Sequence, residues 1–196
     1  MKKIQIRISK TLPKKMRRGF LHEFSYLIML ISLSFSFNAS SQDVQSIRVS
    51  FFSLDEKDCG WMDFVESLDK NESAVAMAYK GSALAASAQC VNGPFNKLKQ
   101  FNKGRDFLEK AVALEPDNAE IRFLRYQVKR ESPWILNYKD LDEDKSILIK
   151  EVMKENSSMD AFLMNKMREY LLNKADLSYL EKEKINSLNH NSNRDG

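Results

Sequence analysis

The chain has 196 residues, with 31 basic and 27 acidic side chains and a formal net charge of +4. Eight basic residues lie in the first 25 positions, so residues 42–196 carry 23 basic and 26 acidic side chains and a net charge of −3. This balance argues against nucleic-acid binding, which relies on a basic face, and no Lys/Arg cluster in residues 42–196 resembles a patch that follows a phosphate backbone.

The N-terminal residues have the pattern of a secretory signal peptide. The basic stretch is followed by an apolar run over 26–37 and by small residues that include Ala39 and Ser41. We therefore expect cleavage before Gln42, a signal peptide over 1–41, and a location in the periplasm or cell envelope. The apolar run is shorter than the roughly 20 residues that span a bilayer. An uncleaved, membrane-anchoring leader remains the alternative, and translation from Met16 in place of Met1 would give a leader of ordinary length.

Two cysteines, Cys59 and Cys90, lie in the exported part of the chain. In an oxidising compartment an even number of cysteines permits a disulfide, here closing a loop of about thirty residues. Two buried thiols on facing helices are the alternative, because a free cysteine packs as a small hydrophobic residue.

Seven helices are predicted in the mature chain, after a lead-in over 42–52 that is extended or helical. Ser53 and Glu56 fit a capping box, and Trp61, Phe64, Val65 and Leu68 follow at helical spacing. The expected helices cover residues 55–69, 72–91, 95–114, 119–129, 141–155, 158–173 and 175–188. The second of them is rich in alanine, glycine and serine, which allows a close approach to its neighbour.

The breaks between these helices come from glycine, proline and polar residues. Asn92-Gly93-Pro94, Glu115-Pro116-Asp117-Asn118 and Ser132-Pro133 interrupt the helical pattern, and residues 134–138 form an apolar connector. The third helix is expected to bury Leu98, Phe101, Leu108, Ala111 and Val112. Residues 42–188 are predicted to form a single all-α domain of antiparallel helical hairpins, and residues 189–196 a disordered tail.

One hairpin resembles the tetratricopeptide repeat. Gly104, Leu108, Ala111 and Pro116 match the small, bulky, alanine and proline positions of that repeat's second helix, at offsets of four, three and five. The resemblance covers about residues 74–130 and implies stacked helical hairpins that bind a protein or peptide segment. The mature chain also resembles small exported helical proteins of Bacteroidetes-type bacteria, a resemblance that implies no activity.

Few residues suggest a catalytic, metal-binding or nucleotide-binding role. The only histidine after the leader is His190, in the expected tail, and nucleotide-binding glycine motifs are absent from the sequence. Asp140, Asp142, Glu143 and Asp144 form an acidic group that either binds a hard cation or complements the start of a helix. No catalytic residue, metal or cofactor is therefore predicted.

A candidate partner-binding set consists of Arg122, Arg125, Trp134 and Tyr138. Arginines beside aromatic residues can receive a carboxylate or an acidic peptide. The alternative has the arginines solvated while Trp134 and Tyr138 close the end of the hairpin. We expect a binding or scaffold protein without catalysis of its own, with a protein or peptide partner. An accessory subunit of an envelope enzyme, or a chain anchored by its leader, is the alternative function.

Overall fold

The computed structural model describes residues 39–54, 59–68, 71–154 and 156–192. The chain divides into two compact units, Met1–Asp43 and Val44–Gly196. Most of the leader, including Met16, lies outside the described residues.

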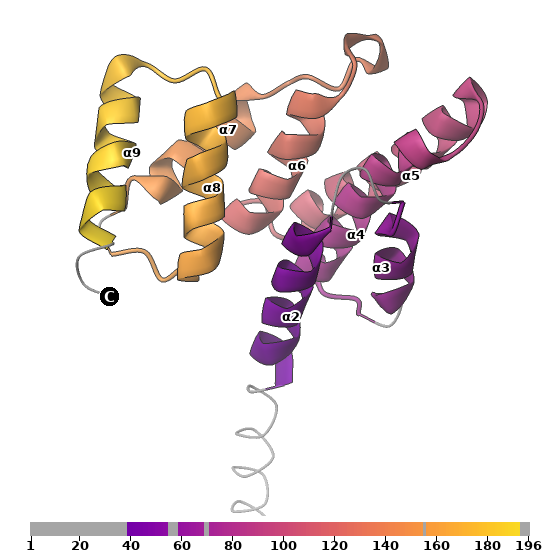
Figure 1. Cartoon of the computed structure of the whole chain (residues 1–196), viewed down its shortest axis with the longest axis horizontal. Helices are drawn as coiled ribbons and strands as arrows, with labels where there is room; N and C mark the ends of the chain where they lie inside the picture. The colour runs from indigo at the N-terminus through magenta and orange to yellow at the C-terminus, as the bar shows by residue number, and fades with distance from the viewer. Residues whose placement is uncertain (1–38, 55–58, 69–70, 155, 193–196) are drawn as a thin grey trace, which may run out of the picture. The chain divides into compact units, whose positions relative to one another are not determined.

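Every regular element among the described residues is helical. The α-helices are α2 (Ala39–Ser53), α3 (Trp61–Ser67), α4 (Ala74–Ser87), α5 (Pro94–Leu114), α6 (Ala119–Glu131), α7 (Asp142–Val152), α8 (Ala161–Lys174) and α9 (Tyr179–Ser192), with 3-10 turns η1 (Ala88–Cys90) and η2 (Trp134–Leu136) (Figure 1). The predicted all-α class is confirmed for these residues, and α3–α9 correspond in order to the seven predicted helices.

Helix α2 shows which of the two predicted forms the lead-in over 42–52 takes, and it corrects the prediction that Ser53 begins a helix. The expected lead-in is helical, and Ser53 ends α2, where its Oγ donates a hydrogen bond to the carbonyl of Ser50 at 2.8 Å. Glu56, the other half of the predicted capping box, lies outside the described residues. The expected cleavage position before Gln42 falls in the first turn of α2.

Helices α4 and α5 pack closely because two glycines face each other. A Cβ atom on Gly104 would lie 2.5 Å from the backbone oxygen of Gly81 and from the backbone nitrogen of Ala85. A Cβ atom on Gly81 would lie 2.8 Å from the Gly104 oxygen. Such distances leave no room for any side chain, so the backbones of the two helices touch at this crossing.

Helix α5 begins at a turn of the chain. Gly93 has φ +83°, a conformation that glycine adopts without strain. Pro94 occupies the first position of the helix, where a backbone N–H would have no partner within the helix, so proline removes no hydrogen bond. Phe101, Leu108, Ala111 and Val112 are buried as predicted. Leu98 is exposed, contrary to the prediction, because it lies on the outward face of the first turns.

Helix α6 lies between two hydrophobic clusters. Ile121 and Leu124 belong to a cluster with α3, α4 and α5, whereas Phe123 and Tyr126 belong to a second cluster with α7, α8 and α9. Asn118 begins the helix by accepting hydrogen bonds from the backbone amides of Glu120 and Ile121. The helix is therefore enclosed on nearly all sides, a position that decides how its charged residues behave.

The C-terminal helices α7–α9 enclose the second cluster. Asp160 caps α8 by accepting a hydrogen bond from the Leu163 amide at 3.1 Å. Helix α9 continues to Ser192, past the boundary expected at residue 188, and residues 193–196 lie outside the described part. No helix in the described residues has the length and apolar character needed to cross a membrane.

Candidate functional site

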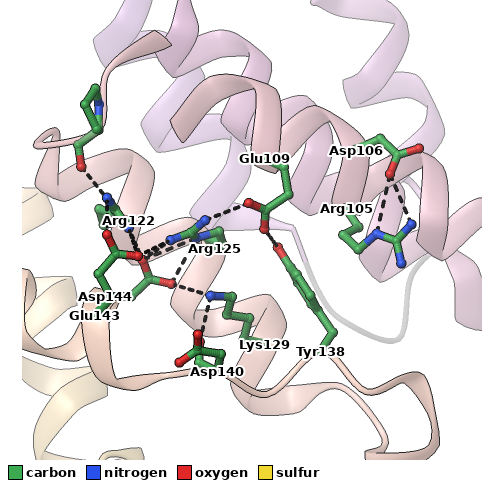
Figure 2. Close-up of polar contacts among 11 residues, drawn as sticks. Arg105, Asp106, Glu109, Arg122, Arg125, Lys129, Tyr138, Asp140, Glu143 and Asp144 are labelled. Carbon is green, nitrogen blue, oxygen red and sulfur yellow. Dashed lines mark hydrogen bonds and ion pairs between the residues drawn. The ribbon is translucent and has the colours of Figure 1, made fainter. Parts of the chain in front are cut away.

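A group of buried charges connects α6 to the start of α7. Arg122, Arg125 and Lys129 occur three and four residues apart, so they share one face of α6. That face meets Asp144, in the first turn of α7, whose side chain is 0% exposed (Figure 2). Figure 2 shows all three cations pointing toward this carboxylate.

The distances show that Asp144 is fully occupied. Arg125 binds it twice, with Nη2 2.6 Å from Oδ1 and Nε 3.0 Å from Oδ2. Arg122 Nη1 lies 3.0 Å from Oδ1, and Lys129 Nζ lies 3.2 Å from Oδ2. Glu143 and Glu109 supply two further carboxylates, 2.8 Å from Arg122 and 2.7 Å from Arg125. Three cations and three carboxylates thus balance in what we call the ion cluster.

The ion cluster shifts the pKa of Arg125 and that of the nearby Tyr138. Burial by itself would lower the pKa of Arg125, but hydrogen bonds and charge from Asp144, with the charge of Glu109, raise it above the ordinary value. Burial and the hydrogen bond to Glu109 raise the pKa of Tyr138. The arginines therefore stay charged and Tyr138 stays protonated, which suits a structural ion pair and does not produce an acid or base near neutral pH.

Tyr138 joins the ion cluster to the connector that follows α6. Its hydroxyl donates to Glu109 Oε1 at 2.6 Å, and its ring packs edge-on against Phe101 of α5 with 6.0 Å between centroids. Lys129 Nζ lies 5.5 Å from the centre of the same ring. Between Tyr138 and η2, Asn137 takes the left-handed conformation at φ +46°. Before η2, the Ser132 hydroxyl donates a hydrogen bond to the Val128 carbonyl of α6, so the connector is held on both sides of η2.

The four residues of the predicted binding set are placed very differently. Arg122 and Arg125 are 3% and 5% exposed, and carboxylates of the chain itself occupy them. The alternative prediction that they are solvated is wrong, because α6 is enclosed. Tyr138 is buried, whereas Trp134 is 81% exposed and closes nothing, contrary to the alternative prediction for it. Of the four, Trp134 alone presents its side chain to solvent.

The arginines of α6 and the acidic residues at the start of α7 were predicted as two separate groups, but the structure pairs them. The acidic run before residue 145 does begin a helix, as one of its two interpretations held, but its buried member is the counterion of the α6 arginines. Two signals point to this pairing: basic residues at positions 122, 125 and 129, and acids in the first turn of the next helix. In the described residues, no group of three or more His, Cys, Asp or Glu side chains is arranged to hold a metal ion.

Exposed apolar side chains occur on η2, in the first turns of α5 and on α3. Trp134 and Ile135 are 81% and 72% exposed, and Phe95 is 86% exposed. We call this region the apolar end, consisting of Met62, Phe95, Leu98, Trp134 and Ile135. It contains five of the nine large apolar side chains that are exposed in the described residues.

Contacts with α5 relate these residues to one another. Leu136 and Tyr138, which follow Trp134 and Ile135 in the sequence, pack with Phe101 of α5. Met62 comes from α3, and its Sδ lies 3.3 Å from Nε2 of Gln100 on α5.

A disulfide fastens α3 near the same end. Cys59 and Cys90 are bonded, with their Cα atoms 5.8 Å apart, and neither cysteine is free. The bond joins the start of α3 to the turn that leads into α5. Of the two alternatives for the cysteines, the structure has the disulfide.

An open pocket of about 490 Å³ lies elsewhere, against α2, α6 and α8. Its charged groups are paired among themselves: Arg48 Nε lies 2.7 Å from Glu120 Oε1, and Lys154 pairs with Glu151. Tyr79 also donates to Glu120 at 2.9 Å. The paired charges of this pocket are already occupied, whereas the side chains of the apolar end are exposed to solvent. The apolar end is therefore the candidate site.

Comparison of the chain with family models, curated proteins and solved structures finds no match. The candidate function therefore depends on the sequence patterns and the geometry of this chain.

Proposed function

We propose that the chain is an exported, tetratricopeptide-like scaffold protein of the bacterial cell envelope that works by binding and has no catalysis of its own. The apolar end is its contact surface. The single observation that carries this proposal is the exposure of Trp134 and Ile135 on a connector that is held at both ends. Exposed clusters of large apolar side chains mark contact sites, and tryptophan is frequent among residues that dominate binding.

The rigid mounting of η2 is the second support. Ordering a mobile loop on binding costs free energy, and a loop that is already held avoids that cost. Here Tyr138 fixes the end of the connector through Glu109 and Phe101, and Glu109 is itself bound by Arg125. The ion cluster thus serves the contact surface indirectly, by positioning the connector that displays Trp134.

The hairpin α4–α5 supports the tetratricopeptide-like part of the proposal. Gly104, at the repeat's small-residue position, lies against the backbone of α4, and Leu108 and Ala111 are completely buried. Pro116 lies in the connector to α6, and its carbonyl accepts a hydrogen bond from Arg122 at 2.6 Å. The resemblance implies a protein or peptide partner, whereas the charges around the apolar end favour a different one, argued below.

The test is capture from the envelope fraction of cells that express the full chain with a C-terminal tag. Three forms are compared: the unchanged chain, a Trp134→Ala/Ile135→Ala variant, and a Tyr179→Ala/Leu180→Ala variant. Tyr179 and Leu180 are exposed to a similar degree on α9, so they control for general stickiness. We expect envelope components to be lost from the first variant alone. Equal recovery with all three forms would show that the apolar end is not the contact surface.

A further inference from the structure

Lysines surround the exposed side chains of the apolar end. On α5, Phe95, Leu98, Lys99 and Lys103 are exposed and share one face, because they are three or four residues apart. Lys97 is exposed on the same turns, and Lys139 follows the η2 connector. Apolar tips and ammonium groups therefore face solvent together.

The first half of α5 contrasts with the rest of the chain. Residues 94–105 contain Lys97, Lys99, Lys103 and Arg105 and no acid, although residues 42–196 as a whole have a net charge of −3. Acids adjoin these segments: Asp63 lies beside Met62, Asp106 pairs with Arg105, Glu131 and Asp140 lie beside the connector, and Glu109 contacts Tyr138 and pairs with Arg125. Glu131 is engaged with Lys174 and Tyr170. The positive charge is thus concentrated where the apolar side chains emerge.

We propose that the apolar end docks onto an anionic phospholipid surface, with Trp134, Ile135, Phe95 and Leu98 entering the headgroup region and the α5 lysines meeting lipid phosphates. This inference rests on the proposed function only in taking the apolar end as the contact surface. Apolar side chains beside lysines match the composition of helices that lie at membrane interfaces, and tryptophan is enriched there. Lysines near an anionic leaflet add to the attraction.

Two observations favour a lipid surface over a protein partner. Lysine is depleted from protein–protein interfaces, yet lysines lie among the apolar residues of this end. The apolar side chains also come from three separate places, α3, the start of α5 and η2, and none of them lines the pocket described above. A fluid bilayer accepts separate protruding side chains, whereas a folded partner would need a matching surface for each.

The chain carries its own probe for the experiment. It has two tryptophans, of which Trp61 is buried and Trp134 is exposed, so a change of emission on binding reports Trp134. The full chain is mixed with vesicles of phosphatidylcholine containing 30% phosphatidylglycerol, or of phosphatidylcholine alone. We expect a blue shift with the anionic vesicles that is abolished by 0.5 M NaCl, because screening weakens exposed charges.

Matched charge reversals test the α5 lysines. The variant Lys97→Glu/Lys99→Glu/Lys103→Glu should bind anionic vesicles at least about tenfold more weakly. The variant Lys110→Glu/Lys150→Glu/Lys182→Glu makes the same charge change at exposed positions elsewhere and should bind as the unchanged chain does. All forms keep the same N-terminus, so a difference in vesicle binding between the two charge-reversal variants comes from the positions at which they differ. Circular dichroism and thermal midpoints verify that each variant folds.

The outcomes separate this inference from the proposed function. Absence of a Trp134 shift with anionic vesicles, while envelope capture still depends on Trp134 and Ile135, would overturn the lipid surface and point to a protein partner. A shift that depends on protein concentration without vesicles would identify a second copy as the occupant and also overturn it. Equal weakening by both charge reversals would overturn the role of the α5 lysines.

Discussion

The ion cluster and the apolar end place their residues in opposite ways. The ion cluster buries three cations and the carboxylate of Asp144 between α6 and α7, whereas the apolar end exposes tryptophan, isoleucine and phenylalanine to solvent. In the ion cluster every charge has a partner within the chain, so the arrangement is complete. In the apolar end the side chains lack comparable partners. The contrast shows that residue type alone does not identify a binding surface, because arginines are available to a partner only when the fold leaves them unoccupied.

The strongest way to break the ion cluster is Asp144→Ala. This change leaves Arg122, Arg125 and Lys129 buried without their shared counterion, a situation that costs about 3–5 kcal/mol. Urea unfolding should show a decrease of that size in the free energy of unfolding. A loss below about 1 kcal/mol would mean that water or Glu143 replaces the carboxylate and that the ion cluster is not essential for stability.

The apolar end has a covalent support that the ion cluster lacks. Replacing Cys59 and Cys90 with serine opens a loop whose closure contributes about 3.7 kcal/mol in the chain-entropy description. We expect the urea midpoint to fall accordingly and added reductant to reproduce the effect in the unchanged chain. An unaltered midpoint after complete reduction would show that α3 is held by packing alone.

The link between the two regions is tested by Tyr138→Phe. Loss of the hydroxyl removes the hydrogen bond to Glu109 and keeps the ring that packs on Phe101, so the cost should be about 1 kcal/mol. If Tyr138 positions the connector, Trp134 should also become more mobile, as measured by fluorescence anisotropy. An unchanged anisotropy would separate the connector from the ion cluster.

Mild acid should weaken the ion cluster at its exposed edge. The hydrogen bond and charge of Arg122 lower the pKa of Glu143 below its ordinary value of 4.5. Because the pKa of Glu143 is lower in the folded state, its ion pair stabilises the fold fully at pH values above the pKa of the unfolded state. This stabilisation is lost as the pH falls through the pKa of the folded state. Stability should therefore decline below about pH 4.5, and less so in Glu143→Gln. Because Glu143 is mostly exposed, the difference should be small.

The apolar end should tolerate truncation with almost no loss of stability. Trp134→Ala/Ile135→Ala removes side chains that already face water, so the free energy of unfolding should change by less than about 0.5 kcal/mol. Thermal unfolding of the variant measures this. A large loss would show that the two side chains support the fold and would remove the reason to consider them a contact surface.

Most of the helical architecture could be predicted from the sequence because local signals set it. Asn92-Gly93-Pro94 ends one helix and begins the next, and the apolar spacing at Phe101, Leu108 and Val112 identifies the buried face of α5. The prediction for Leu98 was wrong because this side chain lies on the outward face of the first turns of α5. Spacing along one helix does not show which of its turns a neighbouring helix covers.

The site was harder to predict because it depends on contacts between helices. Arg122 and Arg125 fit a binding face in the sequence, and only the packing of α7 shows that Asp144 occupies them. The sequence did single out Trp134, since tryptophan directly after Ser-Pro lies in a connector. Its partners in the apolar end, Phe95 and Leu98, come from a helix about forty residues earlier.

The contact between Gly81 and Gly104 has a consequence for recognising relatives of this chain. Any side chain at either position would collide with backbone, so every homologue that keeps this helix crossing must keep a very small residue at both. The charged residues of α6 and α7 can be exchanged in compensating pairs, and the exposed lysines can drift. Two small residues 23 positions apart, on helices joined by a Gly-Pro turn, are therefore the mark by which distant relatives can be found.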